Sequence, residues 1–246
     1  MAPNALRAYQ RLAIAPQQIQ GQQVHLTPPQ RHYLERVLRL RSGERFIAMD
    51  GQGHWWLAEL TAPGQARLGD LLPVDCELPA PVVLVMGIPK GDGMDQVLRQ
   101  VTELGVRRVI PLLTERTQVQ PGAGRLQRWQ RIATEAAEQS WRQWIPQITP
   151  TLGLAEAWAQ VAPMRCLVCA PDQDAPHLLN VLGQPEPLAL WVGPEGGWSG
   201  SELAWFRRQG ATFVSLGKRV LRTVTAPVVA LALVAASWEK SAGAMP

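Results

Sequence analysis

The chain is poor in cysteine and histidine, and this excludes several kinds of site. Its 246 residues include three cysteines, Cys76, Cys166 and Cys169, which are too few for a disulfide framework. The Cys166-x-x-Cys169 pair lies inside an apolar stretch, and a zinc site needs about four ligands, which no second pair or histidine cluster supplies. The four histidines are scattered, so no Ser-His-Asp arrangement indicates a hydrolase. We therefore expect buried free thiols and no metal.

Long apolar runs are also missing. The longest, residues 226–236, has eleven residues, whereas a membrane-spanning helix needs about 20. The chain does not open with the basic, apolar and small-residue pattern of a secretory signal. An apolar content of 46% and a charged content of 18% are typical of a soluble globular protein. We expect a cytoplasmic protein without a membrane partner.

Charge is unevenly distributed along the chain. The formal net charge is +4, yet residues 1–41 hold six arginines against one acidic residue, Glu35, and so carry +5. The remaining residues, with 18 basic and 19 acidic side chains, carry −1. A concentrated basic surface attracts phosphate backbones, so the N-terminal region is a candidate for contact with nucleic acid. A solvated arginine-rich face would explain the same composition.

A change of pattern at Leu78-Pro79-Ala80-Pro81 predicts a boundary between two domains, residues 1–78 and 79–246. The first part is predicted to be β-rich, because only residues 27–38 suggest a helix. In the second part apolar strands alternate with helices, which predicts an α/β domain with a parallel sheet and helices on both faces. The predicted strands of this part are 82–88, 109–113, 164–170, 188–192 and 211–215, and the helices are 94–104, 125–141 and two that start near 201 and 226.

Two glycine-bearing segments follow predicted strands near the end of the chain. The first, residues 190–199, reads Leu-Trp-Val-Gly-Pro-Glu-Gly-Gly-Trp-Ser, and the second, residues 216–223, reads Leu-Gly-Lys-Arg-Val-Leu-Arg-Thr. Glycine permits positive φ and close backbone approach, and parallel sheets bind ligands beyond the carboxyl ends of their strands. We predict that the two loops leave adjacent strands and share one ligand.

Local patterns refine this prediction. Ser199 and Glu202 have the spacing of a capping box, so a helix should begin directly after the first segment. Asp92 or Asp95 should cap the helix that follows the 82–88 strand. Neither glycine segment contains a Walker or Gly-x-Gly-x-x-Gly pattern, which disfavours phosphate and dinucleotide ligands. A plain turn and a solvated basic loop would be the simpler interpretations.

The two segments together resemble the C-terminal signature of the RsmE family, SPOUT-superfamily methyltransferases that modify N3 of a uridine in small-subunit ribosomal RNA. Further matching segments lie in the family's order at residues 32–39, 102–106, 111–117 and 135–146, so the resemblance covers nearly the whole chain. It implies an N-terminal PUA-like β-barrel that binds 16S rRNA and a C-terminal α/β domain with a deep trefoil knot. It also implies S-adenosylmethionine as the cofactor and a homodimer.

The resemblance further implies roles for individual residues. Arg222 is predicted to be catalytic, because a fixed guanidinium would favour the anion of uracil N3. Glu195 is expected to orient its loop through backbone N–H groups rather than to remove the proton. The predicted RNA-binding residues are Arg31, Arg36, Arg39, Arg41, Arg116 and Arg142. The predicted cofactor-binding residues are Leu190, Val192, Gly193, Pro194, Glu195, Gly196, Gly197, Leu216, Gly217, Val220, Leu221 and Thr223.

Two positions depart from the family pattern. Val224 stands where the family usually has a glutamate, and Gln100 stands where it usually has a lysine, so no charged role is carried over to either. One alternative is a ribose 2′-O-methyltransferase of the same superfamily, which would typically have Ser-Leu-Asn at residues 221–223. The other alternative is a noncatalytic rRNA-binding protein.

Overall fold

The computed structural model describes residues 6, 8–119, 122, 124–170 and 174–242. The chain forms two compact units, residues 1–77 with 137–145, and residues 78–136 with 146–246. The sequence prediction placed residues 137–145 in the second domain, whereas the structure includes them in the first unit.

The first unit is built around a six-stranded sheet with the order β1-β4-β5-β6-β3-β2. Its pairs are antiparallel except for β1 with β4. A short α-helix continues directly into a π-helix, within the range for which the sequence predicted one helix. The elements are β1 (Arg11–Ala13), η1 (Pro16–Gln18), β2 (Ile19–Gln20), β3 (Gln23–His25), α2 (Pro28–His32), η2 (Tyr33–Val37), β4 (Arg45–Met49), β5 (Trp55–Ala62) and β6 (Gln65–Leu71).

Residues 137–145 are held in the first unit by buried charge and packing. The Arg142 side chain is 2% exposed, and two of its nitrogens donate to the Glu77 carboxylate, at 2.7 to 3.0 Å. The same carboxylate accepts from the backbone N–H groups of Gln143 and Trp144. The predicted RNA contact of Arg142 stays a prediction, and the burial of its guanidinium within its own unit argues against it.

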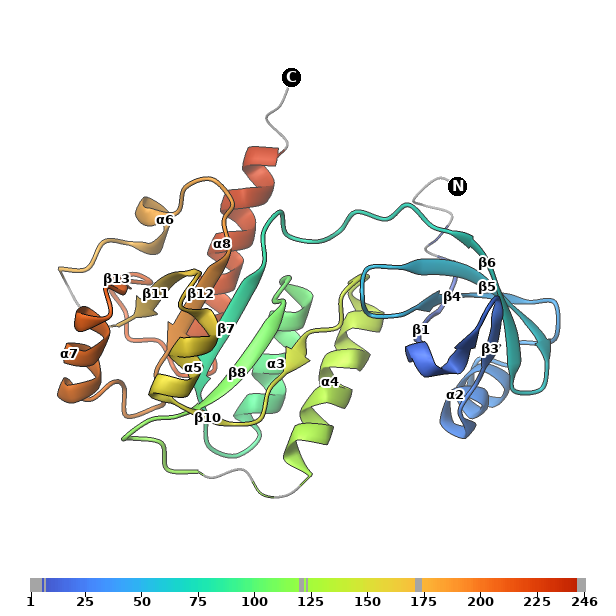
Figure 1. Cartoon of the computed structure of the whole chain (residues 1–246), viewed down its shortest axis with the longest axis horizontal. Helices are drawn as coiled ribbons and strands as arrows, with labels where there is room; N and C mark the ends of the chain where they lie inside the picture. The colour runs from blue at the N-terminus through green and yellow to red at the C-terminus, as the bar shows by residue number, and fades with distance from the viewer. Residues whose placement is uncertain (1–5, 7, 120–121, 123, 171–173, 243–246) are drawn as a thin grey trace. The chain divides into compact units, whose positions relative to one another are not determined.

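The second unit contains a parallel sheet with the order β10-β8-β7-β12-β11-β13, and β9 pairs with β8 (Figure 1). The strands are β7 (Val82–Gly87), β8 (Arg108–Leu113), β9 (Gln147–Ile148), β10 (Leu152–Gly153), β11 (Arg165–Cys169), β12 (Leu188–Val192) and β13 (Thr212–Val214). The helices are α3 (Gly93–Glu103), α4 (Arg125–Gln139), α5 (Leu154–Val161), α6 (Leu178–Val181), α7 (Gly200–Arg208) and α8 (Ala226–Ala242).

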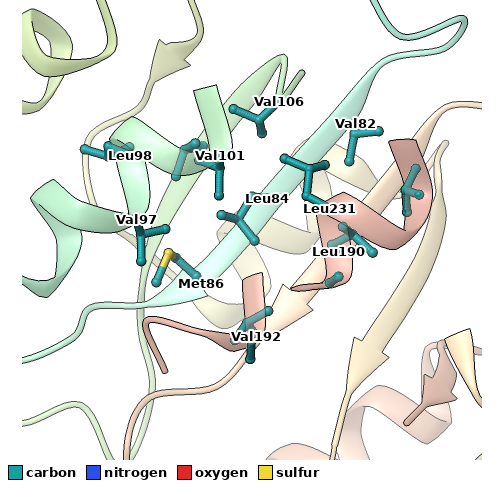
Figure 2. Close-up of a cluster of buried hydrophobic side chains, with 14 of the residues drawn as sticks. Val82, Leu84, Met86, Val97, Leu98, Val101, Val106, Leu190, Val192 and Leu231 are labelled. Atoms are coloured by element: carbon teal, nitrogen blue, oxygen red, sulfur yellow. The ribbon is translucent and has the colours of Figure 1, made fainter. Parts of the chain in front are cut away.

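Both faces of this sheet are covered, as the alternation of strands and helices predicted. Along β7, Val82, Leu84 and Met86 point into one core, whereas Val83 and Val85 point into the other. Figure 2 shows the first core, where apolar side chains of α3 and α8 meet β7 and β12. The second core is aromatic and lies between the sheet and helices α5 and α7. Burial on both faces explains why the central strands are continuous apolar runs.

Candidate active site

The two glycine-bearing loops line a single cavity at the carboxyl ends of the parallel strands. The first loop follows β12 and the second follows β13, and together they enclose about 710 Å³. The strand order corrects one detail of the prediction, because β11 lies between β12 and β13. Cys169 and Ala170, at the end of β11, consequently form part of the cavity wall. Sequence reasoning missed them, although β11 also ends in this row of strand ends.

Nearly all of the predicted cofactor-binding residues line this cavity. Leu190 does not line it, because its side chain is fully buried in the core beside β7. The lining residues are Cys169, Ala170, Val192, Gly193, Pro194, Glu195, Gly196, Gly197, Trp198, Ser215, Leu216, Gly217, Arg219, Val220, Leu221, Arg222, Thr223, Val224 and Ala226. Binding of the cofactor to these residues stays a prediction.

The first loop is a tight turn pressed against β7. The Gly197 N–H donates to the Pro194 carbonyl at 2.8 Å, and Gly197 has a φ of +67°. A Cβ at Gly87 would lie 2.6 Å from the Pro194 nitrogen, so only glycine allows β7 and the loop to approach this closely. Sequence reasoning did not assign Gly87 a role, and its place at the end of a strand was the only signal.

Carboxylates fix the first loop at both of its ends. The Glu195 carboxylate accepts a hydrogen bond from the Lys90 N–H at 3.0 Å, which ties the loop to the segment that follows β7. At the other end, Ser199 and Glu202 form the predicted capping box of α7, with bonds of 2.7 and 3.1 Å. The contact of Glu195 with a backbone N–H is the kind that the sequence led us to expect.

The second loop exposes its basic residues. Lys218, Arg219 and Val220 are exposed, and Val220 is the most exposed of the large apolar residues, at 84%. The Arg222 carbonyl accepts from the Thr225 and Ala226 N–H groups at the start of α8. Arg222 is exposed and is one of the residues that line the cavity, and no side chain of the described residues forms a hydrogen bond or ion pair with its guanidinium. That cation is therefore available to a ligand.

Two other residues of the cavity wall, Cys169 and Val224, carry no charge. Burial raises the pKa of the Cys169 thiol to about 12, so this side chain stays protonated at neutral pH. Val224 also lines the cavity and lies against Gly93, where a Cβ would come within 2.9 Å of its side chain. Because this residue is valine, position 224 contributes no carboxylate to the cavity.

The cysteine and capping predictions need correction at single residues. Cys166 and Cys169 are buried, as expected, but Cys76 is exposed. At the start of α3, Asp92 is the N-cap residue but forms no capping bond with its side chain, and Asp95 instead pairs with Arg128 of α4. Within the described ranges, no group of three or more His, Cys, Asp or Glu residues could hold a metal ion, and no helix could cross a membrane.

The predicted RNA-binding arginines differ in their surroundings. In the first unit Arg31 pairs with Glu35 at 3.0 Å. The exposed side chains of Arg36, Arg39 and Arg41 have no hydrogen bond or ion pair with any described residue. These three lie at the end of the π-helix and just beyond it, close in the sequence to Val37, which is 58% exposed. They form a basic patch, which we call the π-helix patch.

In the second unit Arg116 follows β8 and donates to the Gly196 carbonyl at 2.7 Å. This arginine therefore touches the first glycine-bearing loop, which the sequence did not predict.

Known protein families match segments in both units of the chain. Residues 76–235 match the family described as RNA methyltransferase domain, and residues 26–67 match the RNA methyltransferase PUA domain. The chain is 45% identical to ribosomal RNA small subunit methyltransferase E of Synechocystis sp. over 236 residues, which cover 93% of this chain and 78% of that protein. It is 27% identical to the Bacillus subtilis protein of the same name, over 87% of this chain and 90% of that protein.

A solved structure shares the whole fold. Ribosomal RNA small subunit methyltransferase E of Neisseria gonorrhoeae, bound to S-adenosyl methionine, is 33% identical and superimposes with a TM-score of 0.83 over 94% of this chain and 98% of that one. With the RNA methyltransferase and PUA domains both matched, and with sequence and fold shared over nearly the full length, the chain belongs to the RsmE family of RNA methyltransferases.

Proposed function

We propose that this protein uses S-adenosylmethionine to methylate N3 of a uridine in 16S ribosomal RNA. The observation that carries the proposal is the cavity at the strand ends, which both glycine-bearing loops line together with the exposed residue Arg222. Family membership supports the same reaction class.

The residues of the cavity fit the cofactor. A volume of about 710 Å³ lies within the range of pockets for small molecules. Apolar side chains such as Val192, Leu216 and Leu221 suit the flat face of a nucleobase, and glycine-rich backbone offers N–H and C=O groups for the polar atoms. When bound, the cofactor supplies an electrophilic methyl group on a sulfonium.

Arg222 would activate the acceptor base. Loss of the N3 proton spreads negative charge over O2 and O4 of uracil, and a fixed guanidinium beside these oxygens stabilises that anion. Arg222 would thus hold the N3 lone pair ready for the methyl group that a bound S-adenosylmethionine would supply. Holding the two reactants in line contributes to the rate by removing the entropy cost of their encounter.

Neither Glu195 nor Val224 is suited to accept the proton of uracil N3. The Glu195 carboxylate already binds the Lys90 N–H, which supports a role in shaping the loop. Val224 has no titratable group. We therefore propose that the proton passes to water, because the guanidinium of Arg222 makes N3 more acidic.

The first unit would bind the RNA. Its π-helix patch presents Arg36, Arg39 and Arg41 to solvent without a hydrogen bond or ion pair to any described residue, and such guanidinium groups are well suited to phosphate oxygens. Arg31 and Arg116 are weaker candidates, because each already donates to a group of its own unit.

The remaining proposals follow from family membership. We propose that the C-terminal segment forms the deep trefoil knot of SPOUT proteins, that the protein acts as a homodimer, and that it works in the cytoplasm on ribosomal RNA.

Primer extension tests the proposed reaction. N3 methylation blocks Watson–Crick pairing, so reverse transcriptase should stop at one uridine of 16S rRNA from cells that contain the protein and read through in cells that lack it. A 2′-O-methylated site would instead show up as resistance to alkaline cleavage. Calorimetry with S-adenosylmethionine distinguishes both enzymes from a noncatalytic RNA-binding protein, which should give no binding heat.

A further inference from the structure

A buried carboxylate connects two loops that come from different strands. Glu202 of α7 is 4% exposed, and each of its carboxylate oxygens accepts a backbone N–H. One oxygen binds Ser199 at 2.7 Å, within the capping box. The other binds Glu115 at 2.9 Å, in the loop after β8, 87 residues away in the sequence. Glu202 thus does more than cap its own helix.

The loop after β8 contacts the first glycine-bearing loop through Arg116. This loop, Thr114–Thr117, closes on itself through a bond of 2.9 Å from the Thr114 N–H to the Thr117 hydroxyl. Arg116 donates to the Gly196 carbonyl at 2.7 Å, and a Cβ at Gly196 would lie 3.1 Å from the Arg116 Cβ. The Arg116 side chain therefore lies directly on the first glycine-bearing loop.

A third contact closes the arrangement. The Ser201 hydroxyl donates to the Glu115 carboxylate at 2.6 Å. Hydrogen bonds from Ser201 and Ser199 lower the pKa of Glu115, so this carboxylate stays charged and able to accept them. The start of α7 consequently holds the Thr114–Thr117 loop through two hydrogen bonds. The bond between the Glu115 N–H and Glu202 is partly buried, and the bond between Ser201 and the Glu115 carboxylate is exposed.

We propose that Glu202 is a positioning residue that anchors the Thr114–Thr117 loop, so that Arg116 holds the Gly193–Trp198 loop in the shape that binds the cofactor. The link to cofactor binding rests on the proposed function, whereas the link between the loops rests on the contacts alone. A carboxylate that only capped its own helix would need one acceptor oxygen. Glu202 uses both, one for the N–H of Ser199 at the end of the first glycine-bearing loop and one for the N–H of Glu115 in the loop after β8.

Three variants of the full-length protein test the coupling. Glu202→Gln keeps the shape but leaves only one acceptor oxygen for two N–H groups, and Arg116→Ala removes the far end of the connection at an exposed position. The matched control is Glu156→Gln. Glu156 caps α5 in the same way, with 3.0 Å from the Gly153 N–H to its carboxylate, but this bond stays within the start of its own helix.

Hydrogen exchange of residues 193–198 is the first measurement. Glu202→Gln and Arg116→Ala should both speed exchange in this loop, the double variant should exceed the larger single effect only slightly, and Glu156→Gln should leave the loop unchanged. Unchanged exchange in Glu202→Gln, or fully additive effects, would overturn the proposal. If Glu202→Gln does not fold, Ser201→Ala cuts the exposed bond alone and should shift the loop in the same direction.

Calorimetry with S-adenosylmethionine is the second measurement. Each single variant should weaken binding about five- to tenfold, the size of one lost hydrogen bond, and again without additivity. Loop exchange that responds while the unmodified protein gives no binding heat would sustain the loop connection and reject the proposed function. Normal binding in both variants would reject the role of Glu202.

Discussion

The two units use their charged groups in opposite ways. The first unit displays Arg36, Arg39 and Arg41 to solvent, without a hydrogen bond or ion pair to any described residue. The second unit lines its cavity with glycine-rich loops and apolar side chains, and its acidic side chains, Glu195 and Glu202, are bound to N–H groups of neighbouring loops. A phosphate chain needs charge that can reach it, whereas a small cofactor needs a fixed shape. The difference indicates that the two binding tasks depend on different atoms.

The first unit also contains an exception, since Arg142 is buried and paired with Glu77. Glu77→Ala should lower the free energy of unfolding by about 3–5 kcal/mol, because it removes the carboxylate that the buried guanidinium binds. The matched control is Glu59→Ala, whose partner Arg45 is exposed and 3.7 Å away, and which should cost less than about 1 kcal/mol. Urea denaturation measures both, and similar losses would mean that Arg142 finds water or another partner.

Arg222 is the cation that we propose acts in the cavity. Arg222→Ala should reduce turnover about 10²- to 10³-fold, as for the loss of a group that stabilises an oxyanion, and should change cofactor affinity little. Lys218→Ala is the control, because Lys218 is exposed in the same loop but does not line the cavity. Single-turnover methylation and calorimetry report the two quantities. Full turnover in Arg222→Ala would remove the activation step from the mechanism.

Gly87 tests whether the cavity depends on backbone shape. Gly87→Ala would place a Cβ 2.6 Å from the Pro194 nitrogen and push the first glycine-bearing loop away from β7. We expect a stability loss of about 1–3 kcal/mol, as for an overpacked site, together with weaker cofactor binding. Gly200→Ala, with no atom within 4 Å of the added methyl, should leave both unchanged. Thermal unfolding with and without cofactor measures these effects.

The π-helix patch should give the smallest change in energy but a distinct salt signature. Replacing Arg36, Arg39 and Arg41 with alanine should weaken RNA binding and flatten its dependence on salt. The log–log slope should fall by about 0.7 to 0.9 for each phosphate group that the protein no longer neutralises. Arg45→Ala is the control, because Arg45 pairs with Glu59. Filter binding across a salt series would contradict the assignment if the slope did not change.

Local patterns were sufficient to predict parts of the site. The capping box of Ser199 and Glu202 formed as its spacing predicted, because both partners lie within one helical turn. The same spacing gave no sign of the second bond of Glu202, since Glu115 lies 87 residues away. The ion pair of Arg142 was not foreseen for a similar reason, because its partner Glu77 is 65 residues distant. Burial and pairing at such separations depend on how the strands are arranged.

The sequence by itself determined the types of the main elements and the positions of the two glycine-bearing loops. Apolar periodicity, caps and glycines act over a few residues, so they can be recognised without a fold. Only the tertiary structure decided that β11 lies between β12 and β13, that residues 137–145 belong to the first unit, and which arginines are exposed and which are buried in ion pairs. These features depend on contacts between distant parts of the chain, where packing and desolvation rather than local spacing set the lowest free energy.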